Sequence, residues 1–262
     1  MWVEKLARFG YAAKGVVYAI VGILAVMAAF SAGGKTTGTK GALQTIAAQP
    51  FGQFLLVLVA IGLCGYVLWR FVEAIKDPDN KGTDAKGIAA RLGYVGSGIL
   101  YAGLAFNAAL LAMGSSQGGG SGDSTQDWTA KVMQQPFGRW LVGIGGAIAI
   151  GVGFYMLYKA YSVKFRKKLN LSELNLEQEK WAVRISRFGL AAKGVVLTMI
   201  GFFLLQAAYQ YDPSEARGLD GALQTLAQQP FGKFLLGIVA LGLVAYGIYM
   251  WVEARYRRIR TT

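Results

Sequence analysis

One motif occurs three times in this chain. It reads Gly41-Ala-Leu-Gln-Thr-Ile-Ala-Ala-Gln-Pro-Phe-Gly52, returns at 221–232 with two substitutions, and has a looser copy at 127–138 that keeps the Gln-Pro-Phe-Gly end. Self-similarity of this kind indicates a repeat architecture in which each copy marks one structural unit. We therefore expect three units of one design at residues 1–76, 85–162 and 181–262, with a basic amphipathic linker at 163–180.

The composition is that of a membrane protein, with 54% hydrophobic and 16% charged residues. Six segments are apolar for about the length that crosses the hydrocarbon core of a bilayer. They are Gly15–Gly34, Phe51–Trp69, Leu92–Met113, Trp140–Tyr158, Gly194–Tyr211 and Phe234–Val252. We predict an all-α polytopic membrane protein with six transmembrane helices, arranged as three parallel two-helix repeats around a pseudo-threefold axis.

The net charge of +13 is distributed unevenly between the two sides of the predicted bundle. Nineteen Lys and Arg residues lie at the termini and in the loops 70–91 and 159–187, whereas the opposite loops hold six. By the positive-inside rule both termini lie in the cytoplasm, where the basic excess faces anionic lipid headgroups. Nucleic-acid binding is not expected, since no basic stretch carries interleaved aromatic residues or a recognised motif.

Each unit opens with a short amphipathic stretch, at 2–10, 85–93 and 181–189. Trp, Leu and Ile on one side with Lys and Arg on the other are typical of a helix that lies at the headgroup level before the chain turns into the bilayer. Upstream of the third copy, Asn175 is followed three residues later by Gln178, a spacing that predicts a helix cap.

The repeated motif itself predicts a corner between the two helices of a unit. Leu43 and Ile46 fall on one helical face and Gln44 on the other, which indicates a short interfacial helix. Pro50 is well placed as the first residue of the next helix. In the second unit, the Gly- and Ser-rich stretch 114–127 is expected to be a flexible loop without a ligand.

Small residues recur seven positions apart on the first helix of each unit. The pairs are Gly15 with Gly22, Gly194 with Gly201, and Gly98 with Ala105. Such faces allow a neighbouring helix to come close, because packing holds helices together in lipid. The second helix of unit two contains five glycines between 143 and 153, from which we expect it to be buried at the centre of the bundle.

Four ionisable residues fall within the predicted spans or at their ends: Lys14, Glu73, Lys193 and Glu253. Unit two lacks both charges, with Ser97 in place of the Lys and Lys159 in place of the Glu. Because a charge inside lipid is normally paired, this joint loss predicts the ion pairs Lys14–Glu73 and Lys193–Glu253. The alternative is that each Lys extends to the headgroups and each Glu pairs with a local Arg such as Arg70.

Polar side chains gather at the three corners, on the side of the membrane opposite the termini. They are Gln44, Thr45, Gln49, Gln134, Gln135, Gln224, Thr225, Gln228 and Gln229. If the three units surround one axis, these residues could line a polar mouth. Alternatively, they satisfy backbone groups at the proline corners or face water.

Enzymatic chemistry is not expected from this sequence. It has no His, a single Cys and no nucleotide-binding loop, and its acidic residues lie near helix ends or in loops. We therefore predict no catalytic residue, no metal ligand and no cofactor. Cys64 is expected to act as a small apolar packing residue.

The stretch Arg8 to Val17, the Gly-Ala-Leu-Gln-Thr and Gln-Pro-Phe-Gly elements and the closing Glu-Ala resemble the bacterial membrane family catalogued as "domain of unknown function 1206". The resemblance covers essentially the whole chain and implies a bacterial inner-membrane location without an established activity.

Two functions remain open from the sequence. The first is passage of a small solute or ion along a pseudo-threefold axis, which a hydrated cavity lined by the corner Gln residues would favour. The second is a scaffold that organises lipids, further copies of itself or another membrane protein, which a tightly packed axis would favour.

Overall fold

The computed structural model describes residues 2–30, 36–115, 124–170 and 175–259. Within these residues, six helices are long and apolar enough to cross a membrane: α1 (Trp2–Ala29), α3 (Gly52–Lys76), α4 (Ala85–Ala112), α6 (Gly138–Tyr161), α7 (Leu176–Gln210) and α9 (Gly232–Tyr256). The prediction of six membrane helices is confirmed. The end of the first predicted span, 31–34, and most of the Gly- and Ser-rich loop, 116–123, lie outside the described residues.

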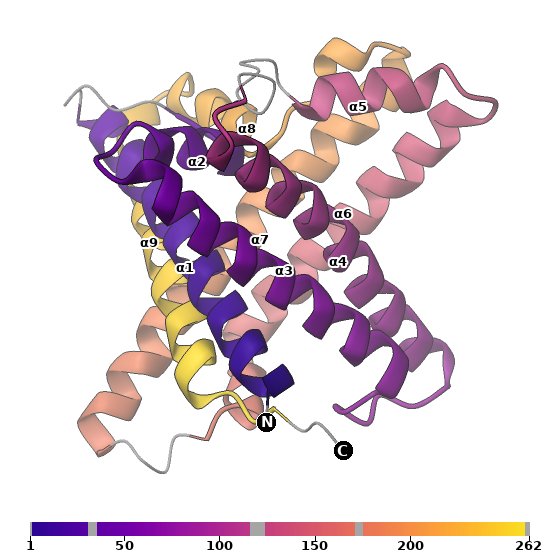
Figure 1. Cartoon of the computed structure of the whole chain (residues 1–262). Helices are drawn as coiled ribbons and strands as arrows, with labels where there is room; N and C mark the ends of the chain where they lie inside the picture. Colours follow the sequence, from indigo (N-terminus) through magenta and orange to yellow (C-terminus); the bar gives the residue numbers. More distant parts are fainter. Residues whose placement is uncertain (1, 31–35, 116–123, 171–174, 260–262) are drawn as a thin grey trace.

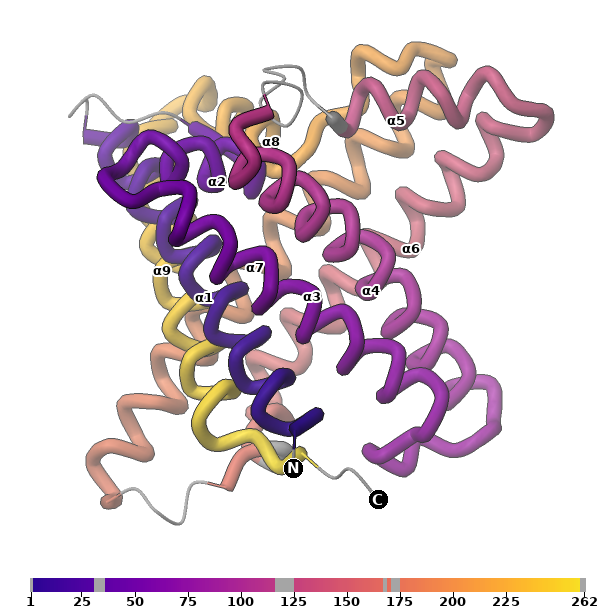
Figure 2. The backbone as a smooth tube through the Cα atoms, in the orientation of Figure 1, coloured from indigo at the N-terminus to yellow at the C-terminus, as the bar shows by residue number. Residues whose placement is uncertain are grey.

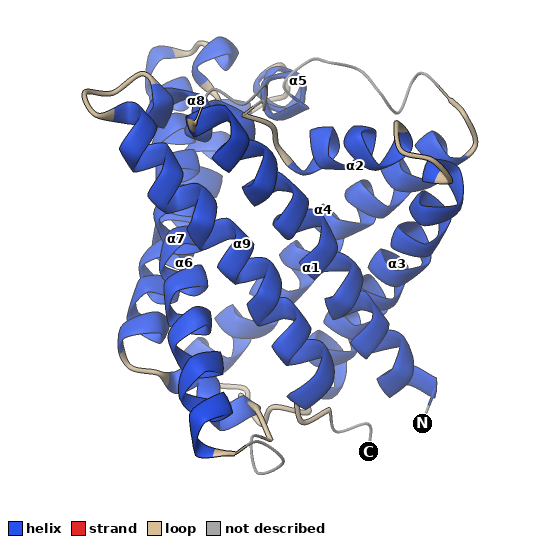
Figure 3. Cartoon of the chain, turned by 90° about the vertical axis from the view of Figure 1, so that its left-hand side faces the viewer, coloured by secondary structure: helices blue, strands red, loops and turns tan. Residues whose placement is uncertain are grey.

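The short elements divide between the two ends of the bundle. Helices α2 (Thr39–Ala47), α5 (Ser124–Met133) and α8 (Leu219–Ala227) lie at the end drawn at the top of Figure 1, which we call the corner end. The turn η3 (Pro213–Glu215) precedes α8, and η2 (Lys164–Lys168) follows α6. Both chain termini lie at the opposite end, which we call the basic end (Figures 1 and 3).

The first helix of each unit runs without a break through its amphipathic opening. Helix α1 already begins at Trp2, α4 at Ala85 and α7 at Leu176. The expected separate helix at the headgroup level is therefore wrong, since the polar stretch forms the first turns of the membrane helix. The predicted cap is confirmed, because the side chain of Asn175 accepts a hydrogen bond from the backbone N–H of Gln178, and the side chain of Gln178 accepts one from the backbone N–H of Asn175.

The three corners share one backbone geometry. The N–H of Gly52 donates to the carbonyl of Gln49 at 2.8 Å, and Phe51 between them is left-handed with φ of 60°. Phe137 and Phe231 repeat this conformation. The second helix begins at the glycine that follows, so the prediction that Pro50 is its first residue is wrong by two positions.

Contacts between units follow a regular order. The second helix of each unit packs on the first helix of the next, giving the pairs α3 with α4, α6 with α7, and α9 with α1. Small residues at these helix–helix contacts let the two backbones approach closely, as the sequence predicts. A Cβ atom on Gly15 would lie 2.8 Å from the carbonyl oxygen of Gly247, and one on Gly201 would lie 2.6 Å from that of Gly146.

Contacts within units are not equal. Helices α1 and α3 pack against each other, as do α7 and α9, whereas α4 and α6 of unit two make almost no contact. The two crossing pairs meet at equivalent glycines, since a Cβ atom on Gly10 or Gly189 would lie 2.4 Å from the backbone nitrogen of Tyr66 or Tyr246. The ring of helices is thus open at unit two, and a pseudo-threefold arrangement stays a prediction.

The open side leaves unit two largely exposed. Within their most apolar windows, only 17% of α6 and 22% of α4 are buried, against 56% for α1 and for α9. The expected central burial of α6 is therefore wrong. Its Gly146 and Gly153 pack on α7, while a Cβ atom on Gly145 or Gly151 would meet nothing within 4 Å.

Cys64 is also exposed, so the expectation that it acts as a small apolar packing residue is wrong. It lies on one helical face with Val57, Ile61 and Leu68, all of them exposed. In a membrane this face of α3 meets lipid.

Candidate functional site

Lys14 lies in the interior of the bundle with 5% of its surface exposed. Its Nζ atom donates a hydrogen bond to the hydroxyl of Tyr66 at 2.9 Å and lies 4.5 Å and 4.4 Å from the ring centroids of Tyr66 and Tyr101. Tyr246 stands further off, at 5.8 Å. An ammonium over an aromatic face is stabilised by the ring quadrupole, and more strongly where water is excluded.

Lys193 joins the same group of rings from the third unit. Its Nζ atom lies 4.5 Å from the ring centroid of Tyr18. The Tyr18 hydroxyl is 3.1 Å from that of Tyr101, whose ring also carries Lys14. We call these residues the tyrosine–lysine cluster: Lys14, Tyr18, Tyr66, Tyr101, Lys193 and Tyr246.

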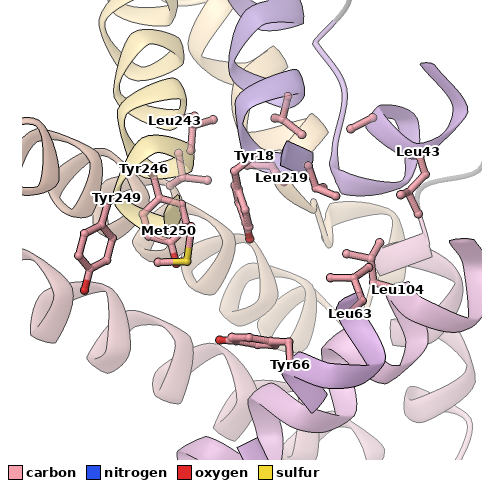
Figure 4. Close-up of a cluster of buried hydrophobic side chains, with 14 of the residues drawn as sticks. Tyr18, Leu43, Leu63, Tyr66, Leu104, Leu219, Leu243, Tyr246, Tyr249 and Met250 are labelled. Carbon is pink, nitrogen blue, oxygen red and sulfur yellow. The ribbon is translucent and has the colours of Figure 1, made fainter. Parts of the chain in front are cut away.

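The repeat explains why these side chains meet. Lys14 and Lys193 are the same position of the identical Ala-Ala-Lys-Gly-Val-Val stretches, and Tyr66 and Tyr246 are the same position of the second helices. Figure 4 shows Tyr18, Tyr66 and Tyr246 reaching one region of the interior from three different helices. The rings pack edge to face, with 4.9 Å between the centroids of Tyr18 and Tyr246, a preferred geometry for aromatic pairs.

A second polar group lies toward the basic end, where two equivalent carboxylates share one arginine. Arg257 donates from Nη2 to Glu73 at 2.5 Å and from Nη1 to Glu253 at 3.0 Å. Arg70 adds a bond of 2.6 Å to Glu73. Glu73, Glu253 and Arg257 are almost fully buried. We call Arg70, Glu73, Glu253 and Arg257 the arginine–glutamate network; two positive charges balance two negative ones.

The third equivalent position lies beside this network. Lys159, which replaces the glutamate in unit two, donates to the hydroxyl of Tyr249 at 3.4 Å, and that hydroxyl donates to Glu253 at 2.8 Å. Side chains from α3, α6 and α9 thus approach one another near the basic end.

The predicted ion pairs Lys14–Glu73 and Lys193–Glu253 do not form. The glutamates pair with arginines, and the alternative that Glu73 pairs with Arg70 is confirmed. Among the described residues, no carboxylate lies within ion-pair distance of Lys14 or Lys193. Because Lys14 is buried over tyrosine rings, it also does not extend to the headgroups.

The corner residues lie at the surface. Gln49, Gln134, Gln135, Gln224, Gln228 and Gln229 are exposed, and Gln44, Thr45 and Thr225 are half-buried. The threonine hydroxyls donate to backbone carbonyls one turn earlier, at 2.9 Å for Thr45 and 2.8 Å for Thr225. Beneath these polar faces Leu43 of α2 and Leu223 of α8 are fully buried. This placement favours the interpretation that the Gln side chains face water.

Sequence reasoning missed the tyrosines and Arg257. The tyrosines carried a signal, since Tyr18 and Tyr101 are equivalent positions of the first helices, as Tyr66 and Tyr246 are of the second helices. No sequence signal separates Arg257 from its neighbours Arg255 and Arg258. Which of these arginines turns inward depends on how α9 ends. Among the described residues, no group of three or more His, Cys, Asp or Glu side chains could hold a metal ion.

Six apolar helices with short helices at the corner end define a polytopic α-helical membrane protein built from three units. The chain belongs to the family described as Domain of Unknown Function (DUF1206), whose family model matches residues 9–77, 92–162 and 188–257. It is similar to the uncharacterized protein YxxB of Bacillus subtilis, with 38% identity over 258 residues that cover 98% of this chain and 92% of the relative. No solved structure matches the chain.

Proposed function

We propose that this protein is a non-enzymatic membrane protein that binds a small anion at the tyrosine–lysine cluster and carries it across the bilayer. The observation that carries the proposal is the placement of Lys14, which is buried, and Lys193, which is half-buried, over tyrosine rings, with no carboxylate of the described residues in ion-pair contact with either. The location we propose is a bacterial inner membrane, with the basic end in the cytoplasm.

The charge balance supports an anion as the bound species. In the arginine–glutamate network two arginines balance two glutamates, Asp79 lies 3.9 Å from Arg257 as a further carboxylate, and none of these three carboxylates is paired with Lys14 or Lys193. A buried charge without a counter-ion is costly, and intramembrane ionisable residues commonly mark ion or substrate pathways. A small anion between the two ammonium groups removes this cost, while the phenolic hydroxyls offer hydrogen bonds to it.

The packing supports a carrier over an open pore. Buried side chains such as Tyr66, Leu63 and Leu243 fill the space between the helices (Figure 4). Passage therefore requires helices to move. The side that can open at least cost lies between α4 and α6, because these two helices have almost no contact to lose.

The proposal is tested by anion flux into liposomes that contain the purified protein. We expect uptake of a monovalent anion such as chloride above that of empty vesicles, without uptake of potassium. The double variant Lys14→Met/Lys193→Met removes both charges and is expected to lower the flux about tenfold or more. Lys233→Met is the matched control, since Lys233 is exposed at the corner end and its loss leaves flux unchanged.

A stability measurement separates loss of binding from loss of folding. An anion that binds only the folded protein raises its unfolding free energy by about 2.7 kcal/mol at a concentration one hundred times its dissociation constant. We expect chloride at constant ionic strength to raise the thermal midpoint of the wild type but not of the double variant. Absence of both flux and this shift in well-folded wild type contradicts the proposal.

A scaffold is the second candidate, and a separate observation favours it. Among the glycines that the structure describes, an added Cβ atom would meet nothing within 4 Å at five, and these five lie in unit two: Gly93, Gly96, Gly103, Gly145 and Gly151. Exposed glycine weakens a helix, yet it lets another membrane helix approach closely. If a second copy docks on the exposed glycines of unit two, fluorescence energy transfer between labelled copies in vesicles will be lower for Gly96→Leu/Gly103→Leu than for wild type and unchanged for Lys233→Met. A wild-type protein that is monomeric at physiological density in the membrane would contradict the scaffold proposal.

A further inference from the structure

Arg257, the residue that follows α9, lies between a surface cavity and the buried interior at the basic end. The cavity has a volume of about 230 Å³, and Arg257 is one of the residues that line it. The same side chain is only 4% exposed, and its guanidinium is held by Glu73 and Glu253 of the arginine–glutamate network. One side chain therefore separates the cavity from the network.

A chain of aromatic and charged side chains connects this network with the tyrosine–lysine cluster. The guanidinium carbon of Arg257 lies 5.0 Å from the ring centroid of Tyr11, whose hydroxyl accepts a hydrogen bond from Arg70 at 3.3 Å. The guanidinium carbon of Arg70 lies 4.6 Å from the ring centroid of Tyr66, and the Nζ atom of Lys14 lies 4.5 Å from the same centroid. Polar contacts thus lead from Arg257 to Lys14.

The backbone around Arg257 is tied to two other parts of the chain. Leu169, after η2, pairs with Arg257 in an antiparallel bridge, and the N–H of Asn170 donates to the carbonyl of Tyr256 at 2.7 Å. Arg8 of α1 donates to the carbonyl of Arg257 at 3.3 Å. Helices α1 and α9 run side by side toward this end of the molecule (Figure 2). Arg257 can leave the network only if the segment after α9 moves.

We propose that Arg257 is the gate at the basic end of the anion path, an inference that rests on the anion carriage proposed above. In the closed state described here, the guanidinium stays between the cavity and the network because two buried carboxylates hold it, and such a contact is costly to break. When the segment after α9 swings outward, Arg257 is withdrawn, and the cavity connects with the side chains that lead to Lys14. Gates of this kind commonly control access to buried sites. The paired state of Arg257 is what closes the path, so the gate requires no unpaired arginine.

A reversible cross-link tests whether this segment has to move. Asn170 and Tyr256 are opposite each other next to the antiparallel bridge, so cysteines at these positions are within reach of a disulfide. In a Cys64→Ser background, we expect oxidation of Asn170→Cys/Tyr256→Cys to lower chloride flux into liposomes about tenfold or more, and reduction to restore it. Each single cysteine variant is a matched control, because it cannot form the cross-link and should not respond to oxidation.

A second pair of substitutions assigns the block to the side chain of Arg257. Arg257→Ala/Glu253→Gln removes the gate together with one glutamate, and the remaining ion pair of Arg70 with Glu73 keeps the charges of the network balanced. In the cross-linked protein these substitutions are expected to restore most of the chloride flux, because the tether then holds a segment without the blocking side chain. This gain is a readout that a misfolded variant cannot give.

The outcomes separate the gate from the carriage on which it rests. Chloride should still raise the thermal midpoint of the cross-linked protein, since the tyrosine–lysine cluster is unchanged. Unaltered flux in the cross-linked protein overturns the gate alone and shows that the anion leaves elsewhere, such as between α4 and α6. Flux that stays blocked after Arg257→Ala/Glu253→Gln also overturns the gate. Absence of both flux and the chloride-dependent shift in the wild type overturns anion carriage, and the gate with it.

Discussion

Arg257 donates a hydrogen bond to Glu73, joining the C-terminal end of the third unit to the first unit across 184 positions of the chain. Both side chains are almost fully buried, and the same guanidinium also holds Glu253. One arginine thus fixes how the two outer units meet at the basic end.

Arg257→Gln is expected to lower the unfolding free energy by about 3–5 kcal/mol, because it leaves two buried carboxylates without their shared partner. The measurement is unfolding in mixed micelles at increasing SDS. Glu73→Gln/Arg257→Gln should cost clearly less than the sum of the two single variants, since contacting residues couple. Arg258→Gln, one position further along and exposed, should leave stability unchanged.

The glycines that face another helix are expected to behave differently from those that face outward. Gly201→Ala places a Cβ atom 2.6 Å from the carbonyl oxygen of Gly146, so the helices must separate at a cost of about 1–3 kcal/mol. Gly151→Ala on α6 meets no neighbour and should raise helix stability by about 0.5–1 kcal/mol. Equal effects of the two substitutions would show that α6 and α7 do not pack closely there.

Much of the fold follows from the sequence because hydropathy and repetition are local properties. The six spans, the three units, the cap at Asn175 and the close approach at Gly15 and Gly201 could all be predicted. The partner of Lys14 could not, because repeats reveal equivalent positions but not which helices meet. Opposite charges within one unit suggested an ion pair with Glu73, whereas the third unit supplies Arg257 to that glutamate.

The lack of contact between α4 and α6 of unit two likewise could not be predicted from the sequence pattern. Glycines on α6 suggested dense packing on all sides, but glycine indicates only that close approach is allowed. Gly146 and Gly153 meet α7, while Gly145 and Gly151 of the same helix meet nothing within 4 Å. Their positions on the helix differ, and only the arrangement of the neighbours decides which face is covered.

Cys64 provides a test of the membrane placement, as it is the one cysteine of the chain. It is exposed on the apolar outer face of α3, so lipid covers it in a bilayer. We expect a membrane-impermeant maleimide to leave it unlabelled in intact proteoliposomes and to label it after denaturation in SDS. Lys233→Cys in a Cys64→Ser background, at the exposed corner end, should react without denaturation. Rapid labelling of native Cys64 would place water beside α3.

Substitutions at the corner of the first unit test whether the motif is repeated because of its backbone conformation. Phe51 has a left-handed backbone conformation. This conformation is unfavourable for residues with a Cβ atom, and only Gly, and occasionally Asn or Asp, adopts it routinely. Phe51→Gly is therefore expected to relieve about 1 kcal/mol of backbone strain, offset by lost contact of the exposed ring with lipid. Gly52→Ala is expected to be the damaging change, because its Cβ atom would lie 2.4 Å from the carbonyl oxygens of both Ile46 and Ala47.

The two corner variants are compared by thermal unfolding in a neutral detergent, with Gln49→Ala as the control on the exposed face. A large loss of stability in Gly52→Ala, with little change in the other two, shows that the motif recurs because each unit needs the same tight turn. If Gln49→Ala is the most damaging of the three, the polar side chains rather than the turn explain the repetition, and the polar mouth at the corner end regains its support.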